Sequence, residues 1–164
     1  GRIDVESEPG RGTSFSVRFP SVAAAPSNSA AARPQAHAGL HGTETILLAE
    51  DEESIRRLAV RGLTKFGYRV LTASDGEEAW RIFRDHDGPI HAVVTDLIMP
   101  HMDGRELAER VLERQPAARI IYSSGYAGDV VSRHGALPAG VPFVQKPYTI
   151  DVLLSRIRET LDAS

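Results

Sequence analysis

Residues 93–100, VVTDLIMP, are the part of this chain from which its fold class can be predicted most directly. It is a short apolar run rich in β-branched residues and is followed by the turn formers of residues 102–104, which is typical of a parallel strand covered on both faces. A lone carboxylate at the end of such a strand is costly unless it has a partner or a task. We therefore expect Asp96 at the carboxyl edge of a sheet, where open α/β sheets bind ligands.

The composition excludes several classes of protein. The 164 residues are 41% hydrophobic and 25% charged, as in one globular domain with an additional segment. A net charge of −3 gives no basic surface for direct nucleic-acid binding. The absence of cysteine excludes disulfides and thiolate sites and fits a cytoplasmic location. No apolar run reaches membrane-spanning length, and Gly1 in place of methionine suggests a piece of a longer protein.

From residue 44 onward, strand and helix patterns alternate. We expect strands at 46–49, 68–73, 92–95, 119–123 and 141–144, and helices at 55–66, 75–83, 104–114, 129–135 and 150–161. Either Ser74 or Asp75 would cap the second helix, and Leu58 and Leu112 belong to the apolar helix positions. Five βα units in a row predict a doubly wound parallel sheet with helices on both faces.

Residues 1–20 have a different pattern. Two alternating segments, around Ile3 and around Phe15, flank the turn formers of residues 9–12, which predicts a β-hairpin. Nothing nearby in the sequence would cover its apolar side chains, so it resembles the end of a domain whose body is absent. Residues 21–43 are rich in Ala, Ser and Pro and predict a flexible linker. A helix there is the alternative, but Pro26 and Pro34 would interrupt it.

The segment SEPGRGTSFSVRFP, residues 7–20, is similar to the last glycine box and final strand of the ATP-binding domain of sensor histidine kinases. The resemblance implies that residues 1–20 are a remnant of such a domain, and a plain hairpin turn is the alternative. The phosphoacceptor-histidine and asparagine boxes of that family are missing, so we do not expect this chain to bind ATP.

Several chemically active side chains follow strands that end at one edge of the predicted sheet. They are Glu50 and Asp51 after the first strand, Asp96 after the third, Ser124 after the fourth and Lys146 after the fifth. Three converging carboxylates repel one another, and a hard cation such as Mg²⁺ would relieve that repulsion. A carboxylate nucleophile, a hydroxyl and an ammonium beside Mg²⁺ suit phosphoryl transfer onto an acid.

Residues 45–162 resemble the receiver domain of two-component response regulators. The pieces that carry the resemblance, in order and at matching spacing, are ILLAEDEESIRRL (46–58), VVTDLIMPHMDG (93–104), IIYSSGY (120–126) and FVQKPY (143–148). The resemblance implies a flavodoxin-like (βα)5 fold with strand order 2-1-3-4-5 in a domain spanning residues 44–164. It also implies a module of phosphorelay signalling.

The resemblance assigns roles to individual residues. Asp96 would accept a phosphoryl group from a phosphohistidine of a histidine kinase or a histidine phosphotransfer protein. Glu50, Asp51, Asp96 and the backbone carbonyl of Ile98 would hold Mg²⁺, with Asp51 as the more direct ligand. Lys146 would neutralise a phosphoryl oxygen. An acidic first turn favoured by the helix dipole is the alternative for the acids after the first strand.

The resemblance also implies a conformational switch. Ser124 would move toward the phosphoryl group, and the ring of Phe143 would turn inward into the space that it leaves. Ser123 stands next to Ser124, so their register is open by one residue, and Phe143 also suits a simple core position. The Lys146–Pro147 peptide is cis in this family.

Two residues depart from the usual pattern of the family. Glu50 stands where Asp is commoner, which could shift the metal geometry. Ile98, two residues after the phosphoacceptor, is apolar where some relatives carry a polar side chain, and we expect it to slow attack by water. A phosphatase of the haloacid dehalogenase type would need a second Asp at this position, so we rank that alternative lower.

The prediction for the whole chain is a phosphoacceptor receiver from the C-terminal end of a hybrid histidine kinase. The parent kinase could be associated with a membrane. A free-standing receiver, or a pseudo-receiver used only for binding, is the main alternative. The face between the fourth strand and the last helix is a candidate surface for a homodimer.

Overall fold

The computed structural model describes residues 1–8, 10, 12–19, 39–125 and 140–163. The chain divides into two compact units, Gly1–Pro34 and Gln35–Ser164. The predicted linker lies mostly outside the described residues, and the helix expected at 129–135 lies wholly outside them.

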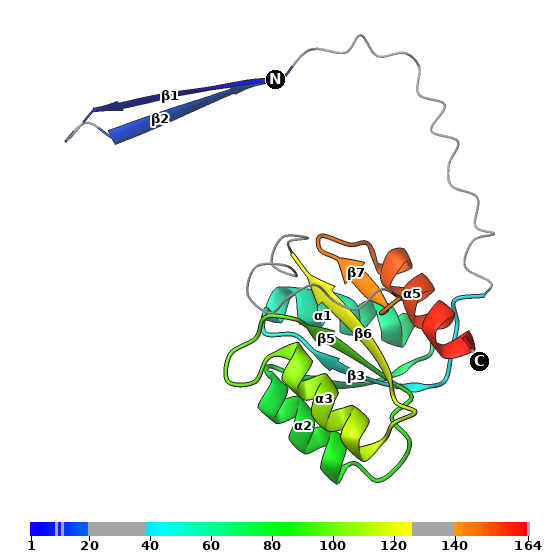
Figure 1. The fold of residues 1–164 in the computed structure, drawn as a ribbon. Coiled ribbons are helices and arrows are strands. Elements are labelled where there is room, and N and C mark those ends of the chain that lie inside the picture. The colour runs from blue at the N-terminus through cyan, green and yellow to red at the C-terminus, as the bar shows by residue number, and fades with distance from the viewer. Residues whose placement is uncertain (9, 11, 20–38, 126–139, 164) are drawn as a thin grey trace. The chain divides into compact units, whose positions relative to one another are not determined.

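The larger unit is built on a parallel sheet of five strands (Figure 1). The strands are β3 (Thr45–Ala49), β4 (Arg69–Ala73), β5 (Ala92–Asp96), β6 (Arg119–Ser124) and β7 (Phe143–Gln145). Their spatial order is β4-β3-β5-β6-β7, which is the predicted order 2-1-3-4-5 within this unit. The flavodoxin-like fold class is therefore confirmed.

The described helices cover both faces of this sheet. They are α1 (Glu53–Lys65), α2 (Gly76–Asp85), α3 (Gly104–Arg114) and α5 (Ile150–Asp162). Helices α2 and α3 lie on one face, and α1 and α5 lie on the other (Figure 1). Asp75, one of the two predicted caps, accepts a hydrogen bond from the Glu78 amide at 2.8 Å and so begins α2.

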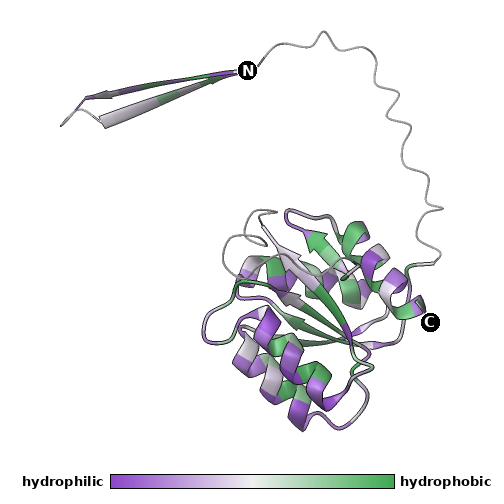
Figure 2. Ribbon diagram, viewed as in Figure 1, coloured by the Kyte–Doolittle hydropathy of each residue, from purple (hydrophilic) through white to green (hydrophobic). Residues whose placement is uncertain are grey.

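Two apolar clusters fill the space between the sheet and its helices, and the central strands are the most hydrophobic part of the unit (Figure 2). Leu47 and Val93 face α2 and α3, whereas Ile46 and Val94 face α1 and α5. Side chains of a strand alternate between faces, so continuous apolar runs are needed where both faces are covered. The pattern from which we predicted a doubly covered sheet thus has a direct structural cause.

Several details differ from the prediction. Leu58 and Leu112 are 61% and 39% exposed, because each lies beside the apolar stripe of its helix and does not face the sheet. The last strand begins at Phe143 and not at residue 141. Pro142 has no amide proton to donate to a ladder, and its carbonyl accepts from the Tyr122 amide at 3.0 Å just before the strand starts.

The smaller unit contains the predicted hairpin of β1 (Arg2–Glu8) and β2 (Gly12–Arg18). Ile3 pairs directly with Val17, and Val5 pairs with Phe15. Each of these four side chains is more than half exposed. Because residues in direct cross-strand register lie on the same face, the hairpin carries one apolar face that no described residue covers.

Candidate functional site

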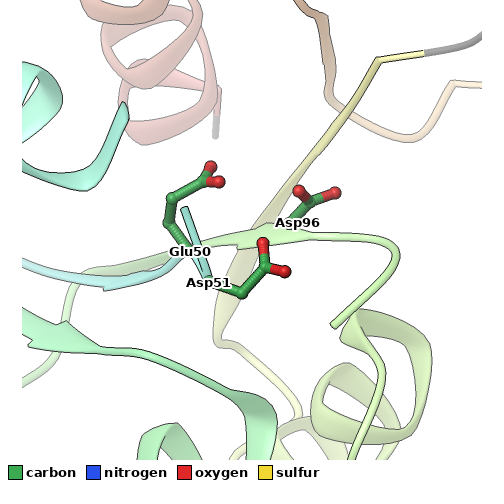
Figure 3. Close-up of side chains that lie close together, drawn as sticks. All are labelled: Glu50, Asp51 and Asp96. Carbon is green, nitrogen blue, oxygen red and sulfur yellow. The ribbon is translucent and has the colours of Figure 1, made fainter. Parts of the chain in front are cut away.

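Three carboxylates meet at the carboxyl edge of the sheet (Figure 3). Glu50 and Asp51 follow β3, and Asp96 ends the adjacent strand β5. One oxygen from each lies within 4.8 Å of the others. Glu50 is only 1% exposed and Asp96 8%, whereas Asp51 faces solvent. The structure therefore brings together the three acids that the sequence singled out.

Lys146, which follows β7, joins two of these acids. Its Nζ lies 2.5 Å from Asp96 Oδ2 and 2.8 and 2.6 Å from Glu50 Oε1 and Oε2. Burial alone would lower the pKa of Lys146, but its hydrogen bonds to Asp96 and Glu50 outweigh this and raise the pKa. Lys146 is therefore a fixed positive charge directly beside the predicted nucleophile.

Glu50 has a different electrostatic balance. Its burial is the largest influence and raises its pKa, although the hydrogen bond and charge of Lys146 work in the opposite direction. Its Oε2 makes no hydrogen bond of good geometry, even though it contacts the ammonium. A buried carboxylate oxygen with spare acceptor capacity suits a cation ligand.

The backbone around Asp96 is tightly packed. Asp96 Oδ1 accepts a hydrogen bond from the Ile98 amide at 3.3 Å. A Cβ at Gly104, the first residue of α3, would lie 2.1 Å from the Asp96 carbonyl oxygen, so only glycine fits there. The turn after β5 thus holds the carboxylate in place. The Ile98 carbonyl stays a predicted metal ligand.

The two predicted switch residues lie on β6 and β7, the two strands that follow β5 in the sheet. Ser124 ends β6 and is 1% exposed, and its carbonyl accepts from the Lys146 amide at 2.8 Å. Phe143 pairs with Tyr122 and packs against the cluster under α2 and α3. The Lys146–Pro147 peptide is cis, as the resemblance implied. The switching roles of Ser124 and Phe143 stay predictions.

Sequence reasoning did not single out two further residues near the site. Arg56 on α1 donates to the carbonyl oxygens of Glu50 and Asp51, at 2.5 and 3.3 Å. Tyr148 has a buried hydroxyl without a hydrogen bond, and its pKa is raised to about 12 by burial and by the charge of Glu50. Both residues stand within the quoted motif pieces, but no sequence pattern indicated their contacts.

The donor set fits Mg²⁺. This ion prefers a few carboxylate oxygens and keeps water or phosphate oxygens as its other ligands. Glu50, Asp51 and Asp96 supply the oxygens, and the exposed position of Asp51 leaves one side of the cluster open to solvent.

No helix among the described residues is long and apolar enough to cross a membrane.

Comparisons with known proteins agree with this site. The family model of the response regulator receiver domain matches residues 46–158. The sensor kinase CckA of Brucella abortus (strain 2308) is 33% identical over 168 aligned positions, which cover 99% of this chain. Only 18% of the length of that kinase is covered, so the chain spans a small part of this relative.

Solved structures have the same fold. The receiver domain of the hybrid histidine kinase CckA is 36% identical, with a TM-score of 0.60 over 71% of this chain and 98% of that one. The response regulator TrrA of Thermotoga maritima, in complex with Mg²⁺ and BeF, is 30% identical, with a TM-score of 0.61 over 72% and 99% of the two chains. The family match also decides against the haloacid dehalogenase alternative. The chain therefore belongs to the response regulator receiver domain family, the phosphoacceptor modules of two-component signalling.

Proposed function

We propose that Asp96 is the phosphoacceptor of this receiver and that the acids around it hold Mg²⁺. The observation that carries the proposal is the ammonium of Lys146, which lies between Asp96 and Glu50 inside a cluster of three carboxylates. A buried carboxylate, a cation and a solvent-facing acid at one sheet edge are what phosphoryl transfer onto an acid requires.

In this mechanism an oxygen of Asp96 attacks the phosphorus of a phosphohistidine. The P–N bond breaks, and its electron pair leaves with the imidazole. Lys146, already 2.5 Å from Asp96 Oδ2, would follow the charge onto a phosphoryl oxygen. Glu50, Asp51, Asp96 and the Ile98 carbonyl would bind Mg²⁺, which neutralises charge on the transferred group. The Ser124 hydroxyl would donate a hydrogen bond to an oxygen of the same phosphoryl group.

The assignment of Asp96 can be tested by incubating the chain with acetyl phosphate and Mg²⁺ and measuring its intact mass. We expect one phosphoryl adduct on the wild type, none on Asp96→Asn, and none after chelation of Mg²⁺. Asp87→Asn is the control, because Asp87 is an exposed carboxylate in the segment before β5. An adduct of equal size on Asp96→Asn would overturn the proposal.

We also propose that the chain comes from the C-terminal end of a hybrid histidine kinase. Its alignment with a sensor kinase covers 99% of the chain and so includes the hairpin. The exposed apolar face of that hairpin is what the last strands of a larger domain would present. The phosphodonor would then be the kinase's own phosphohistidine or a phosphotransfer protein.

The absence of cysteine supports a cytoplasmic location.

The origin of the chain can be tested in the gene. The reading frame upstream of the codon for Gly1 should encode the phosphoacceptor-histidine and asparagine boxes of a kinase. A stop codon or an unrelated domain directly upstream would overturn this second proposal and leave the assignment of Asp96 unaffected.

A further inference from the structure

Arg56 contacts the backbone that carries two of the three acids of the site, Glu50 and Asp51. It lies in the first turns of α1, and its Nη1 donates to the Glu50 carbonyl at 2.5 Å and to the Asp51 carbonyl at 3.3 Å. Its own amide donates to the Glu52 carbonyl at 2.9 Å. One side chain therefore ties the end of β3 to the beginning of α1.

Few other hydrogen bonds among the described residues hold this turn. The Glu50 amide donates to the Ala73 carbonyl at 3.1 Å, which fixes the turn on its sheet side. On the helix side of the turn, the hydrogen bond from the Glu52 amide to Glu50 Oε1 is long, at 3.4 Å. The Glu52 side chain makes no capping hydrogen bond to α1. The Ser54 hydroxyl donates to Glu52 Oε1 at 2.6 Å, but this bond joins two side chains, whereas Arg56 binds the main-chain carbonyls of the turn.

The neighbouring Arg57 provides an internal comparison. It has the same charge and lies one residue further along α1, but its side chain is 80% exposed and pairs with Glu53 at 3.1 Å. Because successive helix residues point about 100° apart, only Arg56 is directed at the turn. The two arginines differ in direction and not in chemistry.

We propose that Arg56 is a positioning residue of the acidic site, whose guanidinium holds the Glu50–Asp51 backbone so that both carboxylates face Asp96. The inference rests on the proposed Mg²⁺ function and deepens it. Groups that orient metal ligands from behind change metal affinity when they are removed. Arg56 would act in this way through main-chain carbonyls and without touching the ion.

The sign of the effect separates positioning from simple charge. A guanidinium close to a cation site repels the ion, so its loss would strengthen Mg²⁺ binding if charge alone mattered. Loss of a positioning group has the opposite effect, because the two carboxylates then sample orientations that do not converge. Methionine is a suitable replacement, since it removes the charge and the donors and keeps an unbranched, flexible chain.

The experiment measures the Mg²⁺ dissociation constant of the full chain by NMR titration of backbone amides. We expect Arg56→Met to raise this constant about tenfold or more, the range found when groups that support metal ligands are removed. Arg57→Met should change it less than about twofold, as expected for an exposed, screened charge. Unchanged or tighter binding by Arg56→Met would overturn the proposal.

Arg56→Lys is a second variant for the case that Arg56→Met does not fold. Its ammonium keeps the charge and can still reach one of the two carbonyls. We expect a dissociation constant between those of the wild type and Arg56→Met, and equal binding by Arg56→Lys and the wild type would count against a role for the two-carbonyl contact. If Arg56→Met does not fold, this variant decides alone. A wild-type chain that neither binds Mg²⁺ nor accepts a phosphoryl group would instead refute the proposed function.

Discussion

The ammonium of Lys146 is shared between the proposed nucleophile and Glu50. Glu50 is one methylene longer than the Asp that is commoner in the family, and its carboxylate reaches the lysine although β5 and β6 lie between their two strands in the sheet. If Lys146 followed the charge onto a phosphoryl group as proposed, Glu50 would lose its nearest cation, and a bound Mg²⁺ would be the group to replace it. The departure at Glu50 is therefore compatible with the chemistry of the site.

Tyr148 offers a test of buried polar groups at this site. Its hydroxyl is buried and makes no hydrogen bond, which costs about 1–3 kcal/mol. We expect Tyr148→Phe to raise the free energy of unfolding by about 1 kcal/mol in urea denaturation. Tyr68→Phe is the matched control, because the Tyr68 hydroxyl donates to the Leu40 carbonyl at 3.1 Å, and its loss should lower stability by about the same amount. Equal signs for the two variants would contradict this account.

Ile98 governs access to the phosphorylated site in our prediction. Its side chain is 40% exposed and lies two residues after Asp96, whose Oδ1 its amide contacts. A polar side chain there could orient a water molecule for attack, whereas an apolar one cannot. We expect Ile98→Asn to lose its phosphoryl group several-fold faster than the wild type in a time course followed by intact mass. Equal rates would remove any role for Ile98 in the lifetime.

At the scale of elements, the segment before β3 is fastened to α5. Arg158 on α5 donates to Glu44 Oε1 at 2.8 Å and to the His41 carbonyl at 3.4 Å, and its guanidinium lies 5.9 Å from the centre of the Tyr68 ring. The Gly42 amide also donates to the Phe66 carbonyl at 3.0 Å. Residues 41–44 therefore follow a fixed path into β3.

This contact predicts a pH dependence. Burial would raise the pKa of Glu44, but the hydrogen bond and charge of Arg158 outweigh it and hold the pKa below its usual 4.5. A depressed folded-state pKa stabilises the fold above pH 4.5, and that contribution is lost as the pH falls through the folded-state pKa. At pH 7 the free energy of unfolding of the wild type, measured in urea, should exceed that of Glu44→Gln by about 1 kcal/mol or less, because solvent screens part of the charge interaction.

Urea denaturation of the wild type and Glu44→Gln at successively lower pH should show that the difference in their free energies of unfolding shrinks below pH 4.5. Glu159→Gln is the control, because Glu159 pairs with Arg156 at an exposed position, with side chains 63% and 43% accessible. Such pairs contribute little, so its free energy of unfolding should match that of the wild type at every pH of the series. A constant difference for Glu44→Gln across this range would show that Glu44 acts through packing and not through its charge.

At the scale of the whole molecule, the two compact units are predicted to be independent. A two-stranded hairpin is marginal in water, whereas described residues of the receiver form an apolar cluster on each face of its sheet. We expect a chain of residues 35–164 to melt at the same temperature as the full chain and to bind Mg²⁺ equally well. Circular dichroism and the NMR titration would measure this, and a clear loss in either would show that the hairpin supports the receiver.

The sequence patterns predicted a parallel sheet with helices on both faces and acids at its carboxyl edge, and the resemblance to receiver domains supplied the strand order. Continuous apolar runs, capping residues and strand-end acids are local signals, and each has one structural solution in a doubly wound sheet. Asp96, Glu50, Asp51 and Lys146 could be named in advance because parallel strands all end at the same edge.

Which side chains meet across that framework became known from the folded structure alone. Two of these contacts join residues from different elements: Arg56 with the carbonyls after β3, and Glu44 with Arg158. The unpaired Tyr148 hydroxyl depends on the rotamer of its side chain. Sequence periodicity gives the face on which a side chain lies but not the atom that it touches, because side-chain direction is set by packing against neighbours distant in the chain. For the same reason Leu58 and Leu112 were expected inside and are exposed.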